Sequence, residues 1–319
     1  MGEQRLPRVV VLGSVHMDLI ATAERLPAPG ESVTGGTFAM APGGKAGNQA
    51  CQLALAGAET TIITRLGDDA FGAQLTAALA GRGVDTAHVS IDKEAATGAS
   101  TVLAAEGDYA SIIAPGAAGR LSHEDVERAR PAIEAADALV VQLEIAAEMS
   151  AAAAAIAAGA GRRVILNASP APDAWRSLPE PLRKATTHLV VNRVEAGRLL
   201  DREPSSAVDV EIAAALAATS GVGTVIVTLG AEGSVASVGG ARFRQPGFSA
   251  AVADAVGAGD AFLGASTVAL LEGRSPDDAL RRGAAAGAIA VARPGVYEAL
   301  PSRREIDAFL SEQGEAPRG

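Results

Sequence analysis

Short apolar runs rich in β-branched residues alternate with longer stretches of helical periodicity along most of the chain. Apolar runs of this kind are typical of parallel strands covered by helices on both faces, so the pattern predicts an α/β fold with a mostly parallel sheet. Strands are predicted at 8–13, 60–67, 138–144, 163–167, 187–192 and 224–230. Helices are predicted at 45–57, 70–81, 122–135, 147–159, 193–200 and 206–219, with two more over 257–292 and a short one at 302–311.

Two segments, 17–41 and 97–113, depart from this rhythm. They show the alternation and turn residues of extended strands, but they are too short for a domain and too β-like for loops. We expect a single domain over 1–319 in which these segments form a small accessory sheet that covers a site.

Composition narrows the class of ligand. The 319 residues are 48% hydrophobic and 20% charged, which is ordinary for a globular protein. The net charge of −10 argues against nucleic acid or an anionic membrane as a partner. An anionic ligand would then need a local device, such as a helix N-terminus or a lysine. Cys51 is the single cysteine, which excludes an internal disulfide. With no signal peptide or membrane span in view, we expect a cytoplasmic protein.

Polar residues follow the predicted strands where each one ends. His16 and Asp18 come after the first strand, Glu144 after the third and Asn192 after the fifth, and Thr228 and Gly230 close the sixth. Ligands of open α/β sheets bind at the carboxyl ends of the strands. We therefore expect the site at this edge.

The stretch DAVGAGD at 254–260 places two aspartates around a Gly-Ala-Gly turn, at the start of an apolar helix. Gly257 and Gly259 allow successive N–H groups to converge on one anion, and the helix start adds its positive dipole end. Asp260 suits a general base beside such an anion site, or alternatively an N-cap. Because the following helix is apolar on nearly every side, its N-terminus is expected to point inward, which favours the functional interpretation.

Other motifs are weaker taken singly. PGGKAGNQA at 42–50 brings glycines and Lys45 to a helix start but lacks P-loop spacing, and Lys45 could equally be a solvated first-turn residue. Glu144 and Glu195 could begin a loop or lie on an exposed helix face. The scattered histidines do not suit zinc, and no G-x-S-x-G or strand-linked G-x-G-x-x-G occurs, which argues against a hydrolase and a nicotinamide dehydrogenase.

Together these pieces resemble the ribokinase-like (PfkB) family of sugar kinases over nearly the whole chain. The order and spacing of the motifs are specific, although each alone is weak. The resemblance rests on GSVHMDL at 13–19, LPAPGESV at 26–33, PGGKAGNQA at 42–50, RLGDDAFG at 65–72, VVQLE at 140–144, VVNRVEA at 190–196, VTLGAEG at 227–233 and DAVGAGDAFLGA at 254–265.

The resemblance implies a three-layer α/β/α core with a small β-sheet lid, and transfer of the γ-phosphoryl group of ATP to a sugar hydroxyl with Mg²⁺ on the phosphates. The expected substrate is D-ribose, giving ribose 5-phosphate. A homodimer formed through the lid is expected by analogy with relatives.

Site residues are carried over by position. The resemblance implies Asp260 as the base, with an anion hole formed by Gly257, Ala258 and Gly259. Sugar contacts are expected from His16, Asp18, Gly44, Lys45, Asn48 and Glu144, in addition to Asp260. ATP contacts are expected from Asn192, Thr228, Gly230, Gly233 and Gly259, with Glu195 supporting Mg²⁺ indirectly. A monovalent cation such as K⁺ would lie at Asp254, Val256, Ala290, Arg293 and Gly295, with Ala299 at a further matching position.

Several positions depart from the family pattern. His16 stands where Asn is usual, and Ala46-Gly47 reverses the common Gly-Ala order. Ala255 replaces a common Thr, Ala118 a common Asn, and Ala299 removes a hydroxyl from the cation site. Two of these changes touch the sugar or lid side. A kinase for another sugar (a ketohexose or a sugar acid) or for a nucleoside is the alternative, and a sugar sensor without turnover is the alternative from another class.

Overall fold

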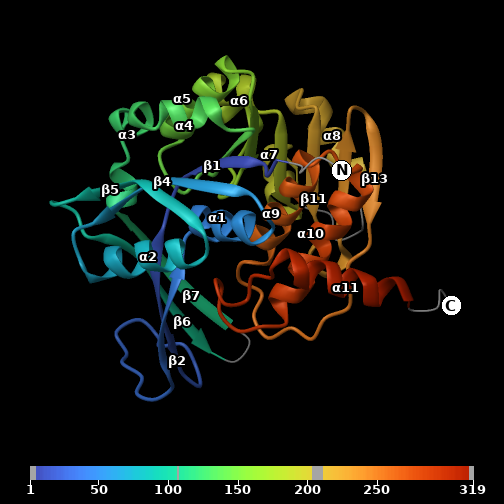
Figure 1. The fold of residues 1–319 in the computed structure, drawn as a ribbon. Helices are drawn as coiled ribbons and strands as arrows, with labels where there is room; N and C mark the ends of the chain where they lie inside the picture. The colour runs from blue at the N-terminus through green and yellow to red at the C-terminus, as the bar shows by residue number, and fades with distance from the viewer. Residues whose placement is uncertain (1–4, 106–107, 203–210, 316–319) are drawn as a thin grey trace.

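The central sheet of the computed structural model, which describes residues 5–105, 108–202 and 211–315, has nine strands in those ranges. Its order is β13-β12-β11-β10-β9-β8-β1-β4-β5 (Figure 1). Neighbours from β11 to β5 pair in parallel, and β12 and β13 add an antiparallel edge. The strands are β1 (Arg8–Leu12), β4 (Glu59–Gly67), β5 (Val84–Asp92), β8 (Ala138–Val141), β9 (Arg163–Asn167), β10 (His188–Asn192), β11 (Thr224–Thr228), β12 (Ser234–Val238) and β13 (Ala241–Gln245).

Helices cover both faces of this sheet, and the alternation of strand side chains explains why. In β1, Val9 and Val11 belong to one buried cluster while Val10 and Leu12 belong to the other. The first cluster contains α1 (Lys45–Leu55), α2 (Ala70–Gly81), α9 (Ala258–Leu271), α10 (Pro276–Val291) and α11 (Arg303–Glu315). The second contains α3 (His123–Arg128), α4 (Arg130–Ala135), α5 (Ala147–Gly159), α6 (Glu180–Ala185), α7 (Arg193–Leu199) and α8 (Glu211–Ser220). The predicted three-layer α/β/α core is confirmed.

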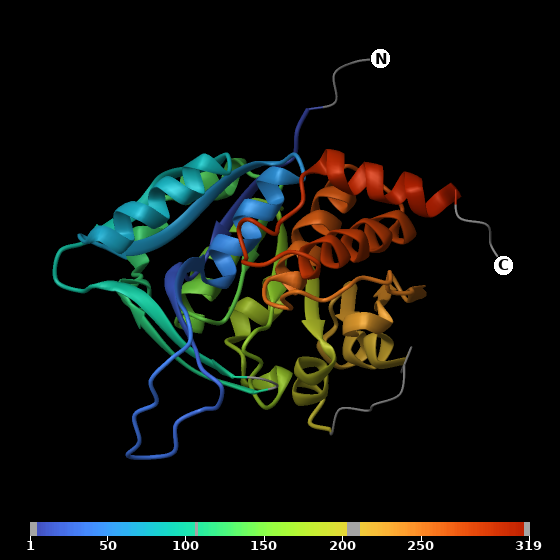
Figure 2. The ribbon, with the colours of Figure 1, turned by 90° about the horizontal axis from the view of Figure 1, so that it is seen from below.

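A second, four-stranded sheet projects from the core beside the carboxyl edge of the central strands (Figures 1 and 2). Its order is β3-β2-β6-β7, with β2 and β6 parallel and both outer pairs antiparallel. The strands are β2 (His16–Thr22), β3 (Phe38–Gly43), β6 (Thr97–Ala105) and β7 (Asp108–Gly116). The two segments predicted for an accessory sheet supply these strands, and the chain passes from β1 into β2 through only three residues, 13–15.

Several elements differ from the sequence-based expectation. The helix predicted at 122–135 is two helices, because Pro131 opens α4 directly after α3. The strands β5, β12 and β13 were not predicted. Most side chains of β5 and β13 are partly or fully exposed, and β12 is buried but consists of small residues, SVASV. Gly239 and Gly240, both at positive φ, form the tight turn between β12 and β13. The start of the helix predicted at 206–219 falls on residues 203–210, which lie outside the described residues. Within the described ranges, none of the helices is long and apolar enough to cross a membrane.

Candidate active site

The carboxyl ends of the central strands and the N-termini of α1 and α9 meet at one place. Lys45 opens α1, and its backbone N–H donates to Glu144 Oε2 at 2.9 Å, just beyond β8. Ser14, directly after β1, also donates to Glu144 through its hydroxyl. Asn48 of α1 reaches Asp260 of α9. The structure therefore brings together the residues that follow β1 and β8 with both helix starts.

Asp260 lies in the first turn of α9, with only 6% of its surface exposed. Its Oδ2 accepts a hydrogen bond from Asn48 Nδ2 at 2.9 Å, and its Oδ1 accepts one from Gln49 Nε2 at 2.8 Å. Burial raises the pKa of Asp260, and the charge of Lys45 and the two amide hydrogen bonds oppose that rise. Asp260 makes no N-cap bond, since Gly257 is the N-cap of α9. The alternative N-cap role for Asp260 is therefore wrong.

A chain of buried side-chain amides fixes the carboxylate of Asp260. Gln142 Nε2 donates to Gln49 Oε1 at 2.6 Å, and Gln49 Nε2 is shared between Asp260 and Asn167 Oδ1 at 3.0 Å. Asn167 in turn donates to the Val190 carbonyl at 2.9 Å. Because every link requires one amide orientation, the chain holds Gln49 with its NH₂ group toward Asp260.

The glycine turn before α9 exposes a set of backbone donors. Gly257 has φ +79°, in the left-handed region that favours glycine, and a Cβ there would lie 2.8 Å from Val296 Cγ1. Helix geometry leaves the N–H groups of Ala258, Gly259 and Asp260 without an intrahelical acceptor. Val256 N donates to Asp254 Oδ1 at 2.9 Å, which fixes the start of the turn. The turn thus presents unpaired N–H groups and a helix dipole next to Asp260.

Lys45 supplies the positive charge of the site. Burial lowers the pKa of its ammonium, but the carboxylates of Asp260, Glu144 and Glu195 outweigh burial, so the pKa is raised. The side chain therefore stays protonated at neutral pH. A fully solvated first-turn role for Lys45, the alternative left open by the sequence, does not fit a half-buried side chain whose pKa is raised by three carboxylates.

His16 and Asp18 lie at the junction of the two sheets. His16 is 5% exposed, and its Nε2 lies 3.2 Å from Asp18 Oδ1. A Cβ on Gly43 would stand 2.3 Å from Asp18 Oδ2, so glycine at 43 makes room for this carboxylate. Gly44 has φ +92° as the N-cap of α1. His16 Nδ1 is buried and has no hydrogen-bond partner in the described part of the protein.

A cavity of about 670 Å³ adjoins the glycine turn. Four of the predicted nucleotide residues line it, namely Thr228, Gly230, Gly233 and Gly259. Apolar side chains complete the wall, among them Phe248, Phe262 and Val291. Mixed apolar walls with a few polar groups are typical of small-ligand sites.

Asn192 and Glu195 do not line this cavity but cap α7. Asn192 Oδ1 accepts from Glu195 N, and Glu195 Oε2 accepts from Asn192 N, each at 2.8 Å. This capping box holds the Glu195 carboxylate close enough to the site to influence Lys45.

Of the predicted cation residues, Asp254 and Ala290 belong to segments that contact each other. The N–H groups of Ala253 and Asp254 donate to the Val291 carbonyl at 2.7 and 3.1 Å, which ties the start of the glycine turn to the C-terminal end of α10. Ala290 lies in the last turn of α10, and Gly295, at φ +81°, follows it. Arg293 directs its guanidinium to Glu305 at 2.7 Å, so only its backbone faces this segment as a potential ligand. Ala299 is buried and offers a methyl group.

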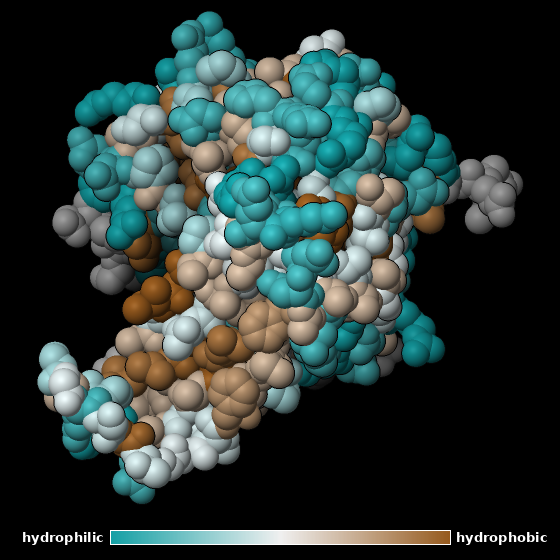
Figure 3. Space-filling model, turned by 90° about the vertical axis from the view of Figure 1, so that its left-hand side faces the viewer, coloured by the Kyte–Doolittle hydropathy of each residue, from teal (hydrophilic) through white to brown (hydrophobic). Residues whose placement is uncertain are grey.

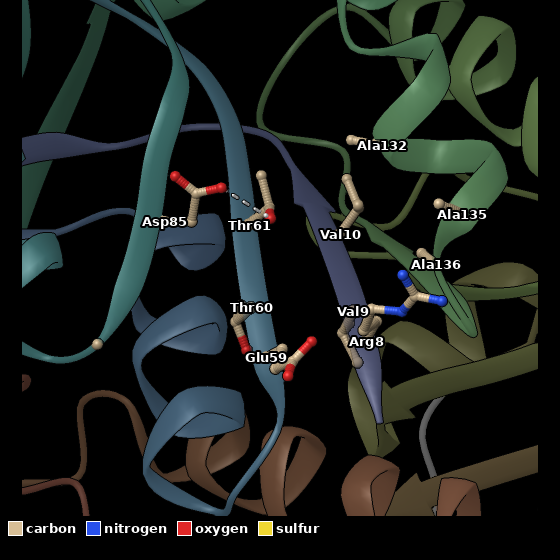
Figure 4. A pocket seen from close by; sticks show the side chains of 11 residues that line it. Arg8, Val9, Val10, Glu59, Thr60, Thr61, Asp85, Ala132, Ala135 and Ala136 are labelled. Atoms are coloured by element: carbon tan, nitrogen blue, oxygen red, sulfur yellow. Dashed lines mark hydrogen bonds between the residues drawn. The ribbon is translucent and has the colours of Figure 1, made fainter. Parts of the chain in front are cut away.

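A second cavity, of about 400 Å³, lies at the opposite, amino edge of the central sheet (Figure 4). The starts of β1 and β4 line it, from Arg8 to Val10 and from Glu59 to Thr61, and Asp85 accepts a 3.4 Å hydrogen bond from Thr61. None of the predicted site residues borders it. The carboxyl edge is therefore the candidate active site.

Sequence reasoning missed several of the residues that hold this site. Gln49, Gln142 and Asn167 form the amide chain, and Ser14 binds Glu144. The one sequence feature that could have indicated these residues is a polar residue within an apolar segment, such as Gln49 in the predicted helix around Cys51. Burial raises the pKa of the Cys51 thiol to about 12, which fits a side chain that packs in the core.

Comparisons with known proteins agree with this geometry. The profile of the pfkB family carbohydrate kinases matches residues 6–303. The ribokinase of Haemophilus influenzae is 34% identical over 95% of this chain and 98% of its own, and that of Bacillus subtilis is 31% identical over 95% and 99%. The structure of Arabidopsis thaliana ribokinase complexed with ribose and ATP superposes with a TM-score of 0.85, at 31% identity, covering 96% of this chain and 99% of that one. On its sequence, its fold and this site, the chain belongs to the pfkB family of carbohydrate kinases.

Proposed function

We propose that the protein transfers the γ-phosphoryl group of ATP to D-ribose, forming ribose 5-phosphate and ADP. The observation that carries this proposal is Asp260, a buried carboxylate at a glycine-rich helix start, with a ligand-sized cavity on the other side of the turn. The named ribokinases among its relatives, one of them complexed with ribose and ATP, support this choice of substrates.

In this proposal Asp260 accepts the proton of the sugar hydroxyl as the hydroxyl oxygen forms its bond to the γ-phosphorus. The bond from that phosphorus to the bridging oxygen breaks, ADP departs, and the proton later passes to solvent. The N–H groups around Gly257, Ala258 and Gly259 stabilise the negative charge on the transferring group. Lys45, protonated beside Asp260, adds a fixed positive charge.

Sugar and nucleotide occupy opposite sides of the turn. Polar groups of His16, Asp18, Gly44, Lys45, Asn48 and Glu144 contact the sugar. Among the described residues, Asn48 Oδ1 and His16 Nδ1 are buried without a hydrogen-bond partner, and each would gain one if sugar binding brought a hydroxyl group within reach. The nucleotide lies in the cavity lined by Thr228, Gly230, Gly233 and Gly259. Asn192 is the register partner of Thr228 on the neighbouring strand β10 and would reach the nucleotide from there.

Mg²⁺ and K⁺ are part of the proposal. Mg²⁺ characteristically binds through substrate phosphates, waters and one or two carboxylates. This agrees with Glu195 near Lys45 and with the finding that no cluster of three or more ligating side chains occurs among the described residues. Mg²⁺ supplies charge neutralisation on the phosphates. K⁺ would be held by Asp254 and by the carbonyl groups of Val256, Ala290, Arg293 and Gly295, where the negative end of the α10 dipole favours a cation.

Another sugar or a nucleoside is the second candidate, and His16 is the observation that favours it. The imidazole stands where relatives place an amide, so the pattern of donors and acceptors around Asp18 changes. A screen of phosphate transfer from ATP across pentoses, hexoses, sugar acids and nucleosides tests both. A sensor without turnover is disfavoured, because Asp260 and its glycine turn are retained.

We also propose that the small sheet acts as a lid and joins two copies into a homodimer. Its outer strands β3 and β7 carry exposed apolar side chains, namely Phe38 at 67%, Met40 at 50%, Ile112 at 76% and Ile113 at 52% exposure. Figure 3 shows apolar side chains gathered on the projecting lower part of the molecule. Exposed apolar sheet faces and unpaired edges of this kind favour pairing with a second sheet.

Replacing the base should abolish most turnover. Asp260→Asn keeps the size of the side chain but cannot accept the proton, so kcat should fall by roughly 10²–10⁴ while sugar binding persists. Steady-state kinetics and sugar titrations measure the two effects. Asp277→Asn, an exposed first-turn aspartate of α10, is the matched control. If the Asp260→Asn variant keeps near-parental turnover, Asp260 has no catalytic role.

Activation by K⁺ should be weak, because Ala299 supplies no side-chain oxygen to the cation. Initial rates in potassium chloride and in tetramethylammonium chloride at equal ionic strength provide the comparison. Ala299→Ser, which returns a hydroxyl, should strengthen the response. Strong activation of the parent by K⁺ would mean that Asp254 and the backbone carbonyls suffice.

His16→Asn should change the preference among sugars, with ribose gaining relative to its competitors. Discrimination is differential transition-state binding, so the shift appears in ratios of kcat/KM, and one polar contact changes them by ~1–3 kcal/mol. Unchanged ratios across the panel, with only the thermal stability altered, would assign His16 to packing beneath the lid.

Placing a charge on the apolar face of the small sheet should separate the dimer. Ile112→Asp should give a monomer in light scattering after size exclusion, because a buried unpaired carboxylate opposes association. Leu6→Asp changes an exposed apolar residue outside that sheet and should leave the dimer intact. A monomeric parent protein would contradict the proposed association.

A further inference from the structure

Residues 296 and 297 lie between the two helix starts of the site. A Cβ on Gly257 would stand 2.8 Å from Val296 Cγ1, and a Cβ on Gly47 would stand 2.2 Å from Tyr297 Oη. Val296 is 4% exposed and Tyr297 1%. Consecutive side chains of one short segment therefore contact the turn before α9 and the first turns of α1.

The hydroxyl of Tyr297 is not accounted for by ordinary packing. It is buried without a hydrogen-bond partner of standard geometry among the described residues, beside the Cys51 thiol. A buried hydroxyl that lacks a good partner is destabilising, and phenylalanine would fill the same core without that cost. The hydroxyl does, however, fit closely against the surface of α1 at Gly47.

Gly47 is likewise unfavourable as a helix residue. It lies inside α1 between Lys45 and Asn48, where alanine would stabilise the helix. No left-handed φ requires glycine there, so the requirement is steric. The phenol oxygen occupies the space that a methyl group would need. This contact explains why glycine stands at position 47, one of the positions that depart from the family pattern.

We propose that Tyr297 is a positioning residue, whose hydroxyl, seated in the notch left by Gly47, sets the start of α1 relative to the glycine turn of α9. The residues on either side of Gly47 are those that the active site uses. Asn48 donates to Asp260 at 2.9 Å, and Lys45 lies half-buried where the charges of Asp260, Glu144 and Glu195 raise its pKa. Val296 holds Gly257 from the same segment, so a shift of either helix is resisted by one rigid dipeptide. The kinetic part of this inference rests on the proposed function.

A double-mutant cycle tests the contact. Gly47→Ala should lower kcat/KM for the best sugar by about 10-fold or more, because its Cβ would overlap Tyr297 Oη and push α1 away. In the Tyr297→Phe background the same methyl group would lie 3.4 Å from the ring Cζ, an ordinary contact. The double variant Gly47→Ala/Tyr297→Phe should therefore recover to within about 3-fold of the parent, since the new methyl fills the space that the hydroxyl leaves.

The pH profile separates positioning from mere stability. Displacing Asn48 removes a hydrogen bond that lowers the pKa of Asp260. The acid limb of kcat/KM should therefore move to higher pH in Gly47→Ala and return in the double variant. Gly81→Ala, in α2 with open space around its Cβ, is the matched control and should leave both rate and profile unchanged.

Equal losses for Gly47→Ala in both backgrounds, or parental kinetics for Gly47→Ala alone, would overturn the proposal. If Gly47→Ala does not fold, recovery of a folded double variant still supports the contact, and its failure to fold contradicts it. If the parent phosphorylates none of the sugars or nucleosides, the proposed function fails. Thermal unfolding of the four proteins then decides the contact alone, through the non-additivity of their Tm shifts.

Discussion

The structure depends on keeping one carboxylate, that of Asp260, in the interior of the protein. A buried charge is costly unless it is paired and hydrogen-bonded. Asn48 and Gln49 meet this demand from α1, Lys45 adds the opposing charge, and the start of α9 adds its dipole. These groups come from helices over 200 residues apart in sequence. The buried carboxylate of Asp260 therefore requires α1 to pack against α9, just as the apolar side chains of the two helices do.

Glycine residues, which have no side chain, shape the site as much as the polar side chains do. At Gly43 a Cβ would overlap the Asp18 carboxylate, and at Gly13 it would lie 2.1 Å from Gln142 Oε1. At Gly257 both the positive φ and the contact with Val296 require glycine. These glycines let carboxylate, amide and backbone groups approach more closely than alanine would permit. The high glycine content of the motifs therefore reflects close approach at a few defined points.

The fold could be predicted from the sequence because its signals are local. Continuous apolar strands such as β8 and β11, buried along nearly all their length, fix the parallel sheet without knowledge of their neighbours. The site could be predicted only from motifs. Strand ends and glycine turns indicate which edge of the sheet holds a site, but not which side chains contact each other there. Gln142 and Asn167 illustrate the limit. Gln142 directly follows β8 and Asn167 ends β9, both as ordinary polar residues. Their role follows only from the position of Gln49, which lies 93 and 118 residues away from them. Long-range amide contacts leave no pattern in a single sequence.

Two departures from the family pattern differ in what they contact. Gly47 is explained by its contact with Tyr297, which in our proposal keeps Lys45 and Asn48 in place beside Asp260. His16 has no such compensating neighbour. Its Nε2 faces Asp18, while its Nδ1 is buried without a hydrogen-bond partner among the described residues. Under the proposed function, His16 is therefore the departure that bears on the choice of sugar, because an imidazole beside Asp18 presents other donors and acceptors than an amide would. A change compensated within the protein preserves the chemistry of the site, whereas an uncompensated change beside the substrate alters which substrate the site accepts.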